Sequence, residues 1–140
     1  MKSYLKPIFL LTFIALATTM ASAQKTPKLR LVFQLSSNDT LVHKSLVKQL
    51  NNLLTAINNV EIEVITHGPG VTMLQENSAV KNNLEKLEKR GVKFLVCRNT
   101  LNEKKIDPKT LLPISSIIPA GLAHIIVRQS EGWSYIKAGF

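Results

Sequence analysis

Short apolar runs rich in β-branched residues alternate with amphipathic segments along this chain, and this alternation constrains the fold more than any other feature. The strand-like runs occupy residues 29–35, 60–66, 92–96, 115–118 and 133–137. Helical spacing of apolar residues, with one shorter helical piece, is found over residues 42–57, 74–90, 99–105 and 120–131. Strands that alternate with helices form a parallel sheet, because each crossover must return the chain across one face of that sheet. The sequence therefore predicts a three-layer α/β/α sandwich with a mainly parallel five-stranded sheet.

The first residues are expected to be removed from the mature protein. Lys2 and Lys6 precede an apolar stretch over residues 8–17, and small residues follow at 21–23. This order is typical of a secretory signal peptide, and the apolar stretch is shorter than the about 20 residues that span a bilayer. We expect a signal peptide over residues 1–23, a periplasmic or secreted location and no stable membrane span. An uncleaved membrane anchor is the alternative.

The remaining residues, 24–140, suffice for one domain with a hydrophobic core and are too few for two. The whole chain has a net charge of +9, from 18 basic and 9 acidic residues. The basic residues are scattered and few aromatic residues lie among them, whereas nucleic-acid surfaces cluster their charge and interleave stacking rings. The charge therefore indicates a solvated surface, and no nucleic-acid partner is expected.

The segments that follow the strands are the expected place for a functional site, because open α/β sheets bind ligands outside the carboxyl ends of their strands. These segments are residues 36–40, 67–70, 97–100 and 119–121. We expect all four to lie on one rim, which gathers the glycines Gly68, Gly70 and Gly121. Gly68 and Gly70 are interpreted as turn residues, since HGPG lacks the fuller glycine patterns that bind phosphate.

Cys97 is the only cysteine in the chain, so no internal disulfide can form. A helix that begins at Asn99 or Thr100 would present N–H groups to the sulfur, and Arg98 would add positive charge. Both effects favour the thiolate and would lower the pKa of the thiol. The end of a strand is less covered than its middle, so we expect a partly open sulfur. The alternative is a cysteine on the inner face of the strand that packs as a small apolar residue.

His67 is the second candidate residue, and its segment is expected at the same rim as Cys97. Its imidazole could activate the thiol or hold a bound anion. The alternative is a histidine that only bonds the loop backbone. His43 and His124 are interpreted as ordinary helix residues, and three histidines on separate elements give a weak metal signal, so no metal site and no cofactor is expected.

Three stretches, VITHGPG, GVKFLVCRNTL and LLPISSIIPAGLAHIIVRQSEGWSYIK, resemble the DsrE/DsrF family of sulfur-relay proteins, and most of all its small stand-alone DsrE-like members. The resemblance implies a DsrE-like fold that commonly assembles into trimers or hexamers. In the relay members, a cysteine at the position of Cys97 accepts sulfur as a persulfide and passes it to a partner. The stretch RNTLNEKKIDP after Cys97 differs from the alanine-rich helix of those members.

The leading hypothesis is an exported sulfur carrier, or a sulfurtransferase-like protein, that acts through Cys97. Arg98, Asn99 and nearby backbone N–H groups would support the thiolate, and His67 would be an auxiliary group. A homo-oligomer and a sulfur donor or acceptor protein are the expected partners. The alternative is a non-catalytic module for small-ligand binding or assembly, with Cys97 buried. A cysteine hydrolase ranks third, because no acid is identified that would orient His67.

Overall fold

The structure is a computed structural model that describes residues 27–139, so the predicted signal peptide lies outside the described residues. One sheet holds five strands in the order β4-β3-β2-β1-β5, and every neighbouring pair is parallel. The strands are β1 (Leu29–Leu35), β2 (Val60–Thr66), β3 (Val92–Cys97), β4 (Ser115–Ile118) and β5 (Ser134–Lys137). The predicted α/β fold with a five-stranded parallel sheet is confirmed.

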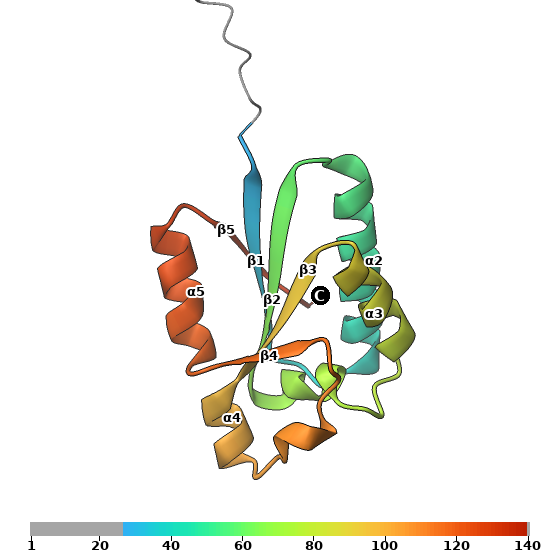
Figure 1. Ribbon diagram of the computed structural model, residues 1–140, viewed down its shortest axis with the longest axis vertical. Coiled ribbons are helices and arrows are strands. Elements are labelled where there is room, and N and C mark those ends of the chain that lie inside the picture. The colour runs from blue at the N-terminus through green and yellow to red at the C-terminus, as the bar shows by residue number, and fades with distance from the viewer. Residues whose placement is uncertain (1–26, 140) are drawn as a thin grey trace, which may run out of the picture.

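Helices cover both faces of this sheet. The α-helices are α2 (Thr40–Ala56), α3 (Lys81–Lys89), α4 (Arg98–Glu103) and α5 (Gly121–Ser130), and 3-10 turns form η1 (Gly68–Leu74) and η2 (Pro108–Thr110). In Figure 1, α2 and α3 lie on one face and α5 lies on the other, which completes the three layers. Among residues 27–139, no helix has the length and apolar character needed to cross a membrane.

The helix predicted over residues 74–90 is shorter in the structure and begins only at Lys81. The segment before it is tied to the loop that precedes β4: the Leu74 carbonyl accepts the Leu112 N–H at 2.8 Å, and Gln75 forms an isolated antiparallel bridge with Leu111. These long-range bonds take the place of helical ones, although the apolar spacing continues through this segment. The helix ends as predicted, with Gly91 at a φ of +93°.

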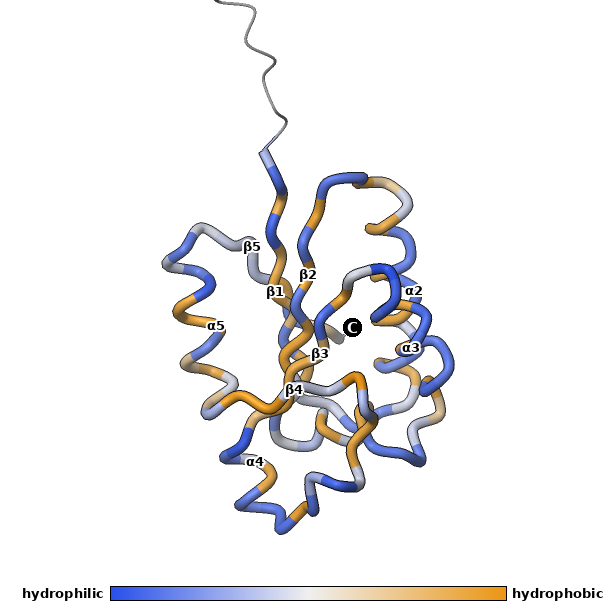
Figure 2. The backbone as a smooth tube through the Cα atoms, viewed as in Figure 1, coloured by the Kyte–Doolittle hydropathy of each residue, from blue (hydrophilic) through white to orange (hydrophobic). Residues whose placement is uncertain are grey.

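The strands present alternate residues to the two faces, as their pleat requires. Phe33 and Phe94 belong to the larger hydrophobic cluster, which lies between the sheet and helices α2 and α3. Val32 and Leu95, their chain neighbours, belong to a smaller cluster beneath α5. Figure 2 shows hydrophobic residues concentrated along the strands and alternating with hydrophilic ones along the helices. By the same alternation, Cys97 points to the α5 side of the sheet.

Candidate active site around Cys97

Cys97 is both the last residue of β3 and the residue that caps the start of α4. The apolar run before it makes the strand, and the polar residues after it begin the helix. Its sulfur also meets the start of the next helix, because the Gly121 N–H at the first residue of α5 donates to Sγ at 3.2 Å. The thiol therefore lies where β3, α4 and α5 meet, at the carboxyl edge of the sheet.

Gly121 brings Cys97 and His67 together. A Cβ atom at Gly121 would lie 3.3 Å from the Cys97 Cβ, 3.4 Å from the His67 Cβ and 3.2 Å from Cγ2 of Ile65. Such distances are tighter than ordinary packing, so the absence of a side chain lets α5 approach the sheet closely. The prediction that Cys97 and His67 lie at the same edge of the sheet is confirmed.

The pKa of the Cys97 thiol is lowered from its ordinary value by opposing effects. Burial raises it, whereas hydrogen bonds from the Gly121 N–H, the Thr100 N–H and hydroxyl, and the Asn99 N–H lower it more. The direction agrees with the prediction, but one predicted cause is absent. The Arg98 side chain is exposed, and backbone and hydroxyl donors, not its guanidinium, stabilise the thiolate.

Cys97 is less accessible than the sequence led us to expect, since only 6% of the residue is exposed. The expectation of a partly open sulfur at the strand end is therefore wrong. The start of α5 covers the sulfur, and the close approach of Gly121 makes this cover tight. The site thus combines a stabilised thiolate with restricted access.

Thr100 is a further site residue, and its role was not predicted from the sequence. Its hydroxyl oxygen accepts the Gly68 N–H at 3.0 Å, and its hydroxyl and N–H both donate hydrogen bonds to the Cys97 sulfur. Thr100 is 5% exposed, so water has little access to its hydroxyl. The available signal was its position in the segment after β3, residues 97–100, which was expected to lie at the rim. Thr100 ties the turn after β2 to the thiol.

His67 belongs to a chain of side chains that leads to the edge of the sheet. Its Nε2 lies 2.8 Å from Nε2 of Gln34, and the Tyr135 hydroxyl donates to Oε1 of Gln34. With that oxygen occupied, the Gln34 amide nitrogen donates to His67 Nε2, which leaves the ring proton on Nδ1. Burial lowers the pKa of His67, so the neutral imidazole is favoured. Neither Gln34 nor Tyr135 was predicted as a site residue.

The remaining rim residues shape the turns around the site. Gly68 has a φ of +52°, which favours glycine. A Cβ at Gly70 would lie 2.3 Å from the Leu35 carbonyl oxygen, so this glycine allows two chain segments to touch. Their interpretation as turn residues is supported by this geometry. Asn99 contributes its N–H to the thiol, while its side chain is exposed together with that of Arg98.

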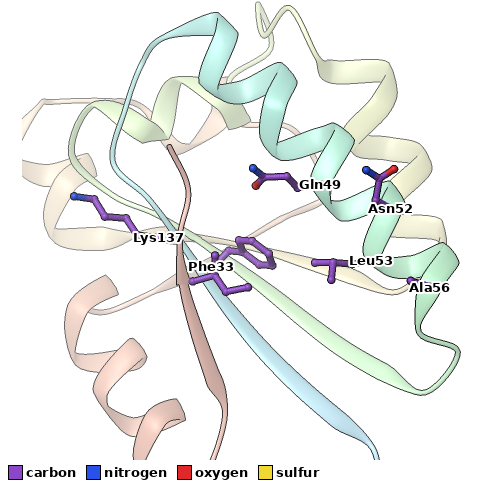
Figure 3. Close-up of a pocket in the computed structure, with 7 residues that line it drawn as sticks. Phe33, Gln49, Asn52, Leu53, Ala56 and Lys137 are labelled. Carbon is purple, nitrogen blue, oxygen red and sulfur yellow. The ribbon is translucent and has the colours of Figure 1, made fainter. Parts of the chain in front are cut away.

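The described residues were also searched for a metal site and for cavities. No group of three or more histidine, cysteine or acidic residues that could hold a metal ion occurs within residues 27–139. A cavity of about 400 Å³ lies on the opposite face, where α2 passes β1 and β5, and Figure 3 shows Phe33 and Leu53 among its lining side chains. None of the residues around Cys97 lines this cavity.

The fold and the site define a class: a parallel α/β domain whose one cysteine ends a central strand, beneath the start of a helix. The model of the DsrE/DsrF-like family matches residues 12–138, so this chain belongs to the DsrE/DsrF-like family. The resemblance found in the sequence is thereby confirmed. No curated protein matches the chain.

Solved structures give the same fold. The protein MTH1491 from Methanobacterium thermoautotrophicum, described as of unknown function, is 33% identical with a TM-score of 0.76, over 78% of this chain and 98% of its own. The conserved protein BT1422 from Bacteroides thetaiotaomicron, also described as of unknown function, is 12% identical with a TM-score of 0.63. That match covers 77% of this chain and 93% of the other, and it shows the fold alone.

Proposed function

We propose that this protein is a sulfur carrier in which the Cys97 thiolate holds a sulfur atom as a persulfide. The observation that carries the proposal is the convergence of donors on the sulfur: the Gly121 N–H at 3.2 Å and the groups of Asn99 and Thr100. Thiolate is the species that attacks sulfur, so groups that stabilise it at neutral pH prepare the residue for this chemistry. Membership of the DsrE/DsrF-like family supports the same proposal.

Transfer of a sulfur atom from a donor persulfide to Cys97 needs no added oxidant. The Cys97 thiolate attacks the terminal sulfur of a donor persulfide, R–S–SH, and a new S–S bond forms. The S–S bond of the donor breaks, and the electron pair leaves with R–S⁻, so that Cys97 becomes Cys–S–SH. The reverse reaction with an acceptor thiolate unloads the carrier. His67, beside Cys97 across Gly121, is an auxiliary group whose Nδ1–H can donate a hydrogen bond to the entering or leaving sulfur species.

Access to the sulfur must be gated in this proposal, because only 6% of Cys97 is exposed. A donor reaches Sγ only when the residues around the start of α5 move.

Intact-mass analysis after incubation with polysulfide tests the carrier directly. We expect a gain of one sulfur atom that a reductant removes and that Cys97→Ser lacks. No gain in folded wild-type protein, at any incubation time, would refute the carrier.

A second candidate function, a non-catalytic assembly module, is favoured by the same burial of Cys97. In this case, the thiol packs against α5 and has no exchange chemistry. Alkylation by iodoacetamide separates the two candidates, since the carrier reacts in the folded state with a rate that follows thiolate formation. Reaction only after addition of denaturant would identify Cys97 as a packing residue.

We also propose a homo-oligomer, a trimer or a multiple of it, and this applies to either function. Three large apolar residues on α5 support it: Leu122 is 57% exposed, Ile126 67% and Val127 51%. Exposed apolar residues that gather on one element commonly mark an interface. Light scattering of the wild type should give a multiple of the chain mass, and Ile126→Lys should lower it, while Asn83→Lys, at an exposed position of α3 on the other side of the sheet, should not. A wild-type monomer at all concentrations would defeat this proposal.

Export is likewise a proposal, supported by the order of charged, apolar and small residues before residue 24. We expect protein recovered from its native cell to begin at Gln24. Terminal sequencing that finds Met1 or Lys2 in a soluble cytoplasmic pool would overturn it.

A further inference from the structure

Glu63 is a carboxylate buried in the middle of the sheet, where apolar residues are normally found. It is 1% exposed and lies on the α5 side of β2. Arg128 binds it with two hydrogen bonds, from Nε to Oε2 at 2.8 Å and from Nη2 to Oε1 at 2.9 Å, and Nε2 of His124 lies 2.8 Å from Oε2. A buried charge is tolerated only with such partners, and both partners come from α5. Glu63 therefore links the sheet to this helix.

Arg128 is itself held in place by further groups. Its guanidinium lies over the Trp133 ring, 4.8 Å from the centroid, and its Nη1 donates to Glu131 at 2.9 Å. Lys93 Nζ on β3 lies 3.9 Å from Glu63 and 2.6 Å from Glu61, and Arg30 on β1 also faces Trp133. The Glu63 carboxylate is thus held by groups from β3 and α5.

Apolar packing holds α5 only weakly. Besides Gly121, the one buried residue of α5 is Ile125, whereas α2 buries five residues. Gly121, His124 and Arg128 are spaced three and four residues apart, so they lie on the same face of α5 as Ile125. The ion cluster with Glu63 and the contact between Gly121 and Cys97 are therefore two parts of one helix–sheet interface.

We propose that Glu63 is a positioning residue for Cys97, which anchors α5 through His124 and Arg128 so that the Gly121 N–H stays on the sulfur. This inference rests on the proposed role of Cys97, and it names a residue outside the rim that sets the reactivity of the thiol. A buried ion cluster is a poor way to gain stability, because apolar residues of the same volume serve at least as well. Its directional bonds instead fix the height and rotation of the helix.

The experiment is a titration of Cys97 in the full chain, followed by thiolate ultraviolet absorbance and by alkylation rate. Cys97 is the only thiol, so both signals report on it alone. Glu63→Gln keeps the shape of the side chain and removes its charge. We expect the pKa of Cys97 to rise and alkylation at neutral pH to slow roughly fivefold, as loss of one hydrogen bond to a thiolate predicts.

Glu61→Gln is the matched control. Glu61 lies on the same strand and the same face, but its partners are Lys28 and Lys93 and not α5. We expect it to leave the titration of Cys97 unchanged. An unchanged pKa in folded Glu63→Gln would overturn the inference. Should that variant fail to fold, Arg128→Lys, which keeps the charge and loses the paired hydrogen bonds, must raise the pKa of Cys97, and no rise would overturn it equally.

The outcomes for Glu63 and for the carrier are distinguishable. Sulfur uptake by the wild type, together with an unchanged Cys97 titration in Glu63→Gln, refutes the positioning role alone. A raised pKa in Glu63→Gln, together with no sulfur uptake by the wild type, refutes the carrier alone. Melting temperatures of both glutamine variants, measured in parallel, show whether the effect on the thiol exceeds a general loss of stability.

Discussion

The two faces of the sheet are covered in opposite ways. On one face, α2 and α3 pack over a cluster of more than twenty buried apolar residues. On the other face, the buried apolar cluster between the sheet and α5 has only five members, Val32, Ile65, Leu95, Ile125 and Trp133. A charged cluster around Glu63 supplements them. The thiol, the imidazole and the buried carboxylate all lie on this second face. The comparison indicates that the first face supplies most of the apolar packing, whereas the titratable groups of the candidate site gather on the second.

The largest expected effect tests this division directly. Leu46 on α2 is 1% exposed in the larger cluster, and Leu46→Ala should lower the free energy of unfolding by about 2–5 kcal/mol. Ile125→Ala on α5 should cost about 2 kcal/mol, at the low end for such changes, because less surrounds it. Urea unfolding measures both. Only the Ile125 variant should also raise the pKa of Cys97, and a rise in the Leu46 variant would break the comparison.

A methyl group at Gly121 should disturb the thiol more than the fold. It would press on Cys97, His67 and Ile65 at 3.2–3.4 Å, so the start of α5 must move by a few tenths of an ångström. We expect Gly121→Ala to cost roughly 1–3 kcal/mol by overpacking, offset in part by the better helix propensity of alanine. The pKa of Cys97 should rise as the Gly121 N–H leaves the sulfur. A thiol titration identical to that of the wild type would show that this N–H has no role.

A substitution at Thr100 should have a smaller effect but a more specific one, because its hydroxyl can be removed with little change in the shape of the side chain. Thr100→Val deletes the hydroxyl that acts on Cys97 and leaves the Gly68 N–H without its acceptor. We expect alkylation at neutral pH to slow roughly two- to tenfold, the range for one lost hydrogen bond. Thr100→Ser keeps the hydroxyl and should react like the wild type. Equal slowing in both variants would point to packing and not to hydrogen bonding.

The sequence predicted the framework of the site better than its details. Apolar runs of β-branched residues located all five strands, and the carboxyl-end rule correctly placed Cys97 and His67 at one edge. Such rules depend on local pattern and on topology, which a sequence carries. They failed at residues 74–80, where apolar spacing continues but a bridge from Gln75 to Leu111 replaces the helix.

Long-range partners account for the rest of what the sequence concealed. Glu63 lies within VEIEVIT, where alternation predicts a strand with one polar face, and nothing local indicates that this residue is buried. Its partner Arg128 is 65 residues away, and the cover that Gly121 places on Cys97 comes from 24 residues away. Arg98, adjacent to Cys97 in sequence, is instead exposed. Exposure depends on such distant contacts, so the accessibility of the thiol was wrongly predicted.

The smallest expected effect concerns the pH dependence of stability, where the buried groups of the second face act in separate ranges. Burial holds the pKa of His67 below its ordinary value of 6.5. Below pH 6.5, the unfolded chain therefore binds a proton that the folded chain does not. The free energy of unfolding decreases as the pH falls from 6.5 to the pKa of His67 in the folded protein. Burial raises the pKa of Glu63, but hydrogen bonds from Arg128 and His124 hold it below 4.5. Its contribution is present above pH 4.5 and is lost as pH falls through the folded pKa.

These ranges separate the two residues in one experiment. We expect His67→Gln to be less sensitive than the wild type to a fall in pH from about 7 to about 5, because it no longer has an imidazole that must stay neutral. Glu63→Gln should keep the slope of the wild type in that range and differ from it below pH 4.5. Chemical unfolding at a series of pH values measures both. The effect of His67 on stability should be modest, since its side chain is only half-buried. Identical dependence of the unfolding free energy on pH in His67→Gln and the wild type, between about pH 7 and about pH 5, would contradict the prediction. The imidazole would then be solvated and free to take a proton beside Cys97.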